Sequence, residues 1–118
     1  MEYKTFDGLN LLEQFRGDEE ILLEMISIFE DNLADLLVPI RKSVINKDAE
    51  QLKLYAHTFK GVLGNFYAEK GKELAYKLEV FGEQSNFDHC IDVLNQLENQ
   101  LHLFIYELNF FKKNLKVD

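Results

Sequence analysis

Apolar residues recur every three or four positions along most of this chain, a spacing that places side chains on one face of an α-helix. No segment shows the alternation of apolar and polar residues, bounded by turn residues, that indicates a β-strand. The last segment shows the helical spacing most clearly, in the seam Leu94, Leu97, Leu101, Phe104, Leu108, Phe111 and Leu115. The pattern predicts helices over residues 9–15, 19–45, 49–67, 68–83 and along this last seam. We therefore expect an all-α fold, an up-and-down antiparallel four-helix bundle with a short extra N-terminal helix.

Five residues are expected to shape the ends and the weak places of these helices. Asp18 and Asp48 precede the second and third helices, and their side chains are expected to cap them. Pro39 lacks an amide hydrogen and clashes with the preceding turn, so we expect a kink or a break in the second helix. Gly71 and Gly82 are expected to be weak points of the fourth helix, because glycine lowers helix stability.

The composition indicates one folded domain over residues 1–118, since 47% of the residues are hydrophobic and no repeat or linker interrupts the pattern. The formal net charge of −8 disfavours a nucleic-acid partner, because most of the surface repels a phosphate backbone. The single cysteine cannot form an internal disulfide, and neither a leader pattern nor an apolar run of about 18 residues is visible. We expect a monomeric cytoplasmic protein that binds neither nucleic acid nor membrane.

The candidate chemistry lies in the third predicted helix, around His57. At about 100° per residue, the side of the helix within roughly 60° of His57 includes Lys53, Lys60, Gly61 and Gly64. The opposite side of the helix collects the apolar residues Leu52, Tyr55, Ala56, Phe59, Val62, Leu63 and Phe66. We therefore expect the apolar face to turn inward and the imidazole to turn outward.

The two glycines beside His57 are informative, because each costs a helix about 1 kcal/mol relative to alanine. Without side chains at Gly61 and Gly64, a bulky group has room to approach the ring. Lys60, one turn along the helix, places a positive charge within reach of whatever the ring acquires. An exposed imidazole is mostly neutral at neutral pH and needs no dedicated base to attack phosphorus. These features favour covalent transfer of a phosphoryl group through His57.

Each of these residues also has a plainer interpretation. His57 and Lys53 can be ordinary solvated side chains, and Gly64 can simply end the helix. A metal site is disfavoured at Asp88, His89 and Cys90, because consecutive helical residues point about 100° apart and cannot close on one ion. No histidine follows a glutamate by three residues, the pairing that carboxylate-bridged bundles use.

The segment from Ala56 to Ala68 resembles the histidine-containing phosphotransfer (HPt) domains of multistep phosphorelays. Their signature joins an alanine and the active histidine to a lysine three residues on and a glycine four residues on, here Ala56, His57, Lys60 and Gly61. Further positions agree with the family, namely Gly64, Asn65, Ala68, Leu74, Ala75, Leu78 and Glu79. The order and spacing of the predicted helices match the family over nearly the whole chain.

The resemblance implies that His57 carries a phosphoryl group between the aspartates of receiver domains, or receives it from the receiver attached to a hybrid histidine kinase. It implies that Lys60 and Gly61 act with His57, and that Gly64 and Asn65 support the site or the docking of a partner. From their places beside the histidine and at the end of the helix, we expect docking or supporting roles for Lys53 and Tyr67 as well. It also implies no autokinase activity, no nucleotide and no cofactor in this chain, and the sequence has no glycine-rich phosphate loop. The Mg²⁺ that assists the transfer is expected in the partner receiver domain.

Two positions depart from the family pattern, Leu63 where a small hydroxyl residue is common and Tyr67 where a glycine is common. Leu63 falls on the core face, whereas Tyr67 ends the helix and is expected to narrow or reshape the docking surface. One alternative is a non-catalytic module of the same fold that binds and regulates a receiver or a histidine kinase. Another is the dimerisation and phosphoacceptor region of a histidine kinase, which needs two subunits to complete four helices, whereas this chain supplies four long helices itself.

Overall fold

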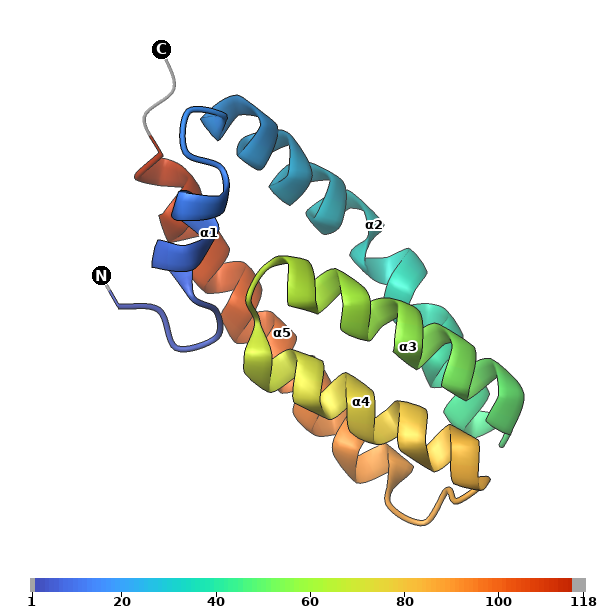
Figure 1. Ribbon diagram of the computed structural model, residues 1–118. Coiled ribbons are helices and arrows are strands. Elements are labelled where there is room, and N and C mark those ends of the chain that lie inside the picture. The colour runs from blue at the N-terminus through green and yellow to red at the C-terminus, as the bar shows by residue number, and fades with distance from the viewer. Residues whose placement is uncertain (1, 116–118) are drawn as a thin grey trace.

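The computed structural model describes residues 2–115, and in this range the chain forms five α-helices and no strand. They are α1 (Gly8–Gln14), α2 (Glu19–Ile45), α3 (Ala49–Asn65), α4 (Glu69–Gln84) and α5 (Cys90–Lys113). Figure 1 shows α2, α3, α4 and α5 running in alternating directions along one long axis, with the short α1 beside the C-terminal end of α5. The predicted all-α bundle with an extra N-terminal helix is therefore confirmed.

The starts of α2 and α3 differ in how they are capped. The Asp48 side chain accepts a hydrogen bond from the backbone N–H of Gln51 at 3.1 Å, as the sequence predicts. Asp18 stands at the corresponding place before α2, but its side chain makes no capping hydrogen bond. The backbone of Asp18 lies outside the extended region that a capping residue normally adopts, so the predicted cap is wrong. Glu19 and Glu20 still place negative charge in the first turn of α2, where the helix dipole favours it.

Pro39 does not break α2, which is continuous from Glu19 to Ile45. In Figure 1 the ribbon of α2 is irregular midway along its length, but it is not interrupted. A proline inside a helix costs about 3 kcal/mol, but burying a large aliphatic side chain contributes about 1.5–3 kcal/mol. Ile40 and Val44 are both buried just after the proline, so packing on the core offsets its cost. The Ser43 hydroxyl also donates a hydrogen bond to the Pro39 carbonyl at 2.7 Å.

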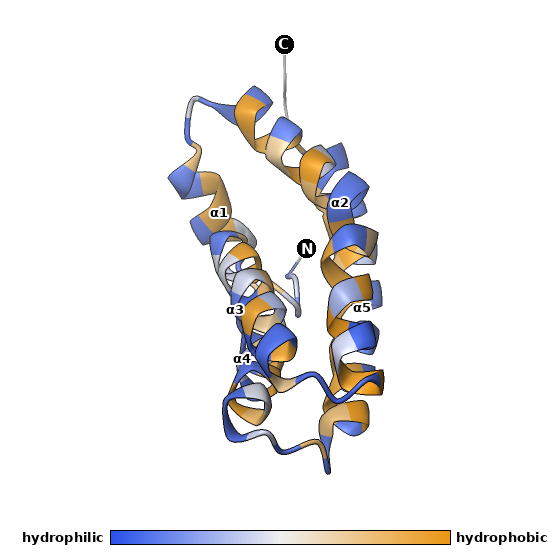
Figure 2. Cartoon of the chain, turned by 90° about the vertical axis from the view of Figure 1, so that its right-hand side faces the viewer, coloured by the Kyte–Doolittle hydropathy of each residue, from blue (hydrophilic) through white to orange (hydrophobic). Residues whose placement is uncertain are grey.

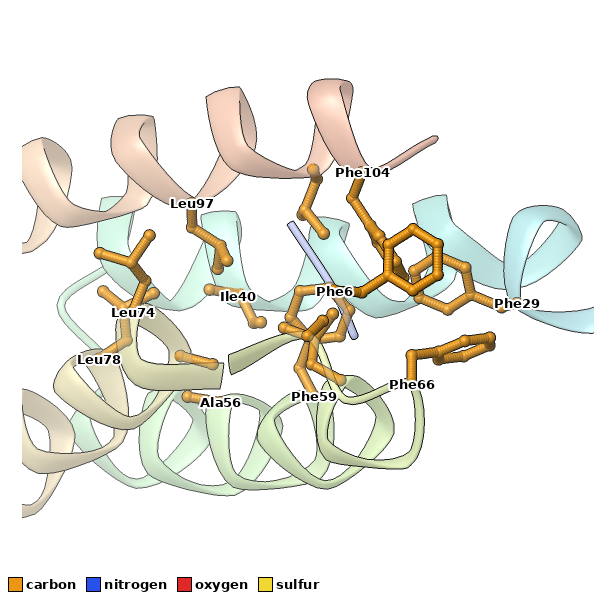
Figure 3. Packing of buried hydrophobic residues seen from close by; sticks show 14 of the residues in the cluster. Phe6, Phe29, Ile40, Ala56, Phe59, Phe66, Leu74, Leu78, Leu97 and Phe104 are labelled. Carbon is orange, nitrogen blue, oxygen red and sulfur yellow. The ribbon is translucent and has the colours of Figure 1, made fainter. Parts of the chain in front are cut away.

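The core runs along the axis of the bundle and ends in a cluster of aromatic rings. Figure 2 shows hydrophobic and hydrophilic residues on different sides of each helix, as amphipathic helices require. Figure 3 shows Phe59 and Ile40 in the middle of the core and Leu78 toward the other end. In the aromatic cluster, the ring centroid of Phe66 lies 4.9 Å from that of Phe29 and 5.7 Å from that of Phe104. These contacts fasten the end of α3 to α2 and α5.

The segment before α1 is attached to α5 by a buried carboxylate that the sequence analysis overlooked. Glu107 lies within the apolar seam of α5 and is almost fully buried. One carboxylate oxygen accepts the backbone N–H of Thr5 at 2.9 Å, and the other accepts the N–H of Lys4 at the same distance. Because a buried charge needs hydrogen-bonding partners, this contact explains how the glutamate is tolerated. Phe6 then packs edge-on against Phe104, with ring centroids 5.4 Å apart.

The two glycines of α4 that the sequence marks as weak points are contact points between α4 and α3. A Cβ atom built on Gly82 would lie 2.7 Å from the backbone nitrogen of Lys53 and 2.8 Å from the carbonyl oxygen of Ala49. A Cβ atom on Gly71 would lie 3.2 Å from Cδ1 of Leu63. Only a residue without a side chain lets the backbones of α3 and α4 approach this closely at Gly82.

Alanine at position 82 should therefore destabilise the protein, although alanine favours helices. The added methyl group meets backbone atoms that cannot move aside, and overpacking of this kind costs about 1–3 kcal/mol. Gly61→Ala is the matched control, because in the part of the chain that the structure describes no neighbouring atom lies within 4 Å of the added Cβ. We expect it to stabilise the protein by up to about 1 kcal/mol. Denaturant unfolding measures the free energy of unfolding of both variants, which should fall for Gly82→Ala and rise for Gly61→Ala. Equal stabilisation by both substitutions would contradict the close contact at Gly82.

Candidate functional site

His57 projects from the solvent side of α3, as its position in the helical pattern predicts. Its side chain is 64% exposed, whereas Ala56 and Phe59 on the other side of the helix are fully buried. One turn beyond His57, Gly61 leaves the helix surface open, since no neighbouring atom of the described residues would lie within 4 Å of a Cβ atom there. Tyr55 differs from its predicted inward position: it is 36% exposed and lines a shallow groove between α2 and α3. It lies at the edge of the apolar face of α3, which explains the difference.

The centre of the site is Glu79, a residue of α4 to which the sequence analysis gave no chemical role. Its carboxylate lies between His57 and Lys60, and its side chain is only 13% exposed. Nδ1 of His57 lies 3.2 Å from Oε2 of Glu79, and the ammonium nitrogen of Lys60 lies 2.8 Å from Oε1. The carboxylate therefore holds the inner edge of the imidazole ring and leaves the outer edge in solvent.

The ionisation of Glu79 determines which nitrogen of His57 carries the proton. Burial raises the pKa of Glu79, but the contacts with Lys60 and then with His57, together with their charges, outweigh it and lower the pKa. An ionised carboxylate can only accept hydrogen bonds. Nδ1 of His57 must therefore donate its proton to Glu79, and in the neutral ring the lone pair lies on Nε2. The exposed nitrogen of His57 is thus the nucleophilic one.

The charge of Lys60, which the sequence predicts to lie within reach of a group on His57, is paired with a carboxylate. The Lys60 side chain is 23% exposed, because it turns toward α4 to pair with Glu79. Its ammonium nitrogen also lies 4.9 Å from the centroid of the Tyr76 ring, within the range of a cation–π contact. Lys60 therefore stays on the His57 side of α3, but its charge is directed at Glu79 in this structure.

The lysines that lie close together in the sequence are separated in the structure. Lys72 extends along α3, and its side-chain atoms Cδ to Nζ would lie 3.7–3.9 Å from a Cβ atom on Gly64. The space beside Gly64 is therefore not open as the sequence analysis expects, because Lys72 of α4 runs through it. Lys70 instead lines a groove of about 940 Å³ formed with the N-terminal segment. Lys53 is exposed, and its backbone nitrogen belongs to the contact with Gly82.

Tyr67 lies at the end of α3 and turns toward α1. Its backbone adopts a left-handed conformation with φ of 56°, which favours glycine, the residue common at this position in the family that the chain resembles. Its carbonyl oxygen accepts the N–H of Asp7 at 3.1 Å, and its hydroxyl donates to Oε1 of Gln14 at 3.2 Å. These bonds tie the α3–α4 turn to the N-terminal segment. The docking roles expected for Tyr67 and for the exposed Asn65 stay predictions.

Within residues 2–115, no group of three or more His, Cys, Asp or Glu side chains is placed to hold a metal ion. His89 is exposed directly before α5, whereas Cys90 is buried. Burial raises the pKa of the Cys90 thiol and the charge of Asp88 raises it further, so the thiolate that metals bind is disfavoured. In the same part of the chain, no helix is both long and apolar enough to cross a membrane.

Comparison with protein families matches residues 24–105 to the Hpt domain. The matched range contains all of α3 and α4, and so includes His57, Lys60 and Glu79, whereas α1 lies outside it. Searches among curated proteins and among solved structures found no match.

Proposed function

Because the chain belongs to the Hpt domain family, which carries phosphoryl groups in phosphorelay signalling, we propose that His57 is its phosphoryl carrier. His57 accepts the group from a phosphorylated aspartate of one receiver domain and passes it to an aspartate of another. The observation that carries this proposal is the ring itself, which is 64% exposed while Glu79 contacts its Nδ1 atom. Nε2 is therefore the nitrogen that a partner can reach. The open helix surface at Gly61 supports it, because a partner's active site must come close to the ring.

The chemistry needs no base from this chain. The lone pair on Nε2 attacks phosphorus, a nitrogen–phosphorus bond forms, and the bond from phosphorus to the aspartate oxygen breaks. The aspartate leaves as a carboxylate and keeps the bonding electrons. Nδ1 keeps its proton throughout, so the phosphorylated ring carries a positive charge. Transfer to the next aspartate reverses these steps.

Glu79 stabilises that positive charge, because its carboxylate lies 3.2 Å from the nitrogen that holds the proton. Exposed ion pairs contribute only about 0–1 kcal/mol to stability, and the His57 ring is largely exposed. The role of Glu79 is therefore to orient and to polarise the ring rather than to hold the fold together. Lys60 in turn orients Glu79 through the ion pair at its other oxygen.

Partners supply the rest of the chemistry. We place the Mg²⁺ that neutralises charge during transfer in the receiver domain, and the original phosphoryl donor in a hybrid histidine kinase. Residues 19–113 form four long helices within one chain, so the bundle is completed without a second subunit. This observation favours a phosphotransfer domain over the dimerisation region of a histidine kinase, which completes its four helices from two subunits.

The first test is substitution of the proposed phosphoryl carrier. Incubation with a receiver domain phosphorylated by acetyl phosphate is expected to label the wild type with an acid-labile, base-stable phosphoryl group. His57→Gln should abolish the label, and His102→Gln, which changes another exposed histidine on α5, should leave it unchanged. Equal labelling of His57→Gln and the wild type would refute the proposal. Binding of the receiver without any labelling would instead support a non-catalytic regulatory module.

Gly61→Ala tests whether the partner approaches the bare helix surface. No atom of residues 2–115 would contact the added methyl group within 4 Å, so the folded protein should be as stable as the wild type or more so. Displacing the docked receiver by about one ångström can slow transfer on the order of a hundredfold. We therefore expect a stable variant with transfer slowed by at least about tenfold. If single-turnover labelling shows that Gly61→Ala transfers the phosphoryl group as fast as the wild type, the partner does not approach this open surface.

A further inference from the structure

Three contacts follow one another along the seam between α3 and α4, on the face that carries His57. The first is the contact of His57 with Glu79. One turn further toward the C-terminal end of α3, the ammonium group of Lys60 lies over the ring of Tyr76. One further turn along, the side chain of Lys72 lies against Gly64. Because α3 and α4 run in opposite directions (Figure 1), these contacts form a continuous strip on the proposed docking face.

Lys72 differs from Lys60 in having its charge available. Among residues 2–115, Lys60 is paired with Glu79, whereas no carboxylate lies within 4.0 Å of the Lys72 ammonium group. The absent side chain of Gly64 gives the aliphatic part of Lys72 a surface to lie on, at ordinary van der Waals distance. Lys72 is therefore a positioned cation beside the docking face, without a partner in the described part of the chain.

The distance along α3 decides what Lys72 can contact. Gly64 lies seven residues beyond His57, which corresponds to about 10 Å along the helix axis. Side chains in helices also lean toward the N-terminus, so the His57 ring points away from Gly64. A phosphoryl group on Nε2 is thus out of direct reach of Lys72. A partner's surface that covers both positions is within reach.

We propose that Lys72 determines docking specificity by pairing with a carboxylate of the receiver domain, about two helical turns from the reacting aspartate. This inference rests on the proposed function of His57. The charge distribution supports it: α3 and α4 carry equal numbers of lysines and glutamates, whereas α2 has a strong excess of acidic residues. An anionic partner is therefore repelled by α2 and meets its most favourable surface along the α3–α4 strip.

The test compares Lys72→Gln with Lys77→Gln in steady-state transfer from receiver domains phosphorylated by acetyl phosphate. Lys77 is the matched control, because it lies on the same helix, is exposed, and points about 140° away from Lys72 around the helix. Lys72→Gln should raise KM by about three- to tenfold with kcat unchanged, and should weaken the dependence of kcat/KM on salt. Lys77→Gln should change neither, and Lys72→Arg should restore the KM of the wild type.

Two results would overturn the inference while leaving the proposed function intact. One is a Lys72→Gln variant with the same KM and salt dependence as Lys77→Gln. The other is a loss of kcat with KM unchanged, which would mean that Lys72 acts on the transferred phosphoryl group. If no receiver labels the wild type, the proposed function itself fails and this inference fails with it. Thermal unfolding of both variants confirms that the comparison is between equally folded proteins.

Discussion

The site depends on how closely α4 lies against α3. At Gly82 the two backbones are separated by less than a side chain would occupy, and Gly71 allows a second close contact with Leu63. That closeness brings the carboxylate of Glu79 to the inner edge of the His57 ring from a different helix. A wider separation would leave the ring without its partner on Nδ1 and would leave Lys60 to solvent. Packing between two helices thus determines which nitrogen of the exposed histidine contacts the carboxylate.

The same carboxylate links local chemistry to the wider charge distribution. Lys60 and His57 lower the pKa of Glu79 and so favour its ionised form. The negative charge of Glu79 is therefore balanced within the site, although the protein as a whole has a formal net charge of −8. The energies involved are small compared with those of the core, where large side chains are fully buried. Stability therefore comes from the core and the aromatic cluster, whereas the polar contacts on the surface orient the imidazole of His57. The bundle acts as a rigid support for one imidazole.

Much of this arrangement could be predicted from the sequence, because it depends on the periodicity of single helices. The spacing of apolar residues predicted the helices and their order, and the helical wheel placed His57 outward with Gly61 beside it. The contact of His57 with Glu79 could not be predicted in this way, because it depends on the register of two helices joined by a turn. That register is determined by close packing at Gly82, which from the sequence alone indicates only reduced helix stability. The continuity of α2 at Pro39 could not be predicted from the pattern of a single helix either, because it depends on the core against which α2 packs.

The most direct test of this account is the protonation of the two ring nitrogens of His57, measured by NMR with ¹⁵N-labelled histidine. An exposed histidine in water favours the tautomer with the proton on Nε2. If Glu79 sets the tautomer of His57, this preference should be reversed. We predict that neutral His57 carries its proton on Nδ1, that the phosphorylated protein shows ³¹P–¹⁵N coupling to Nε2, and that Glu79→Ala restores the ordinary tautomer. A proton on Nε2 in the wild type, or a phosphoryl group on Nδ1, would contradict the account.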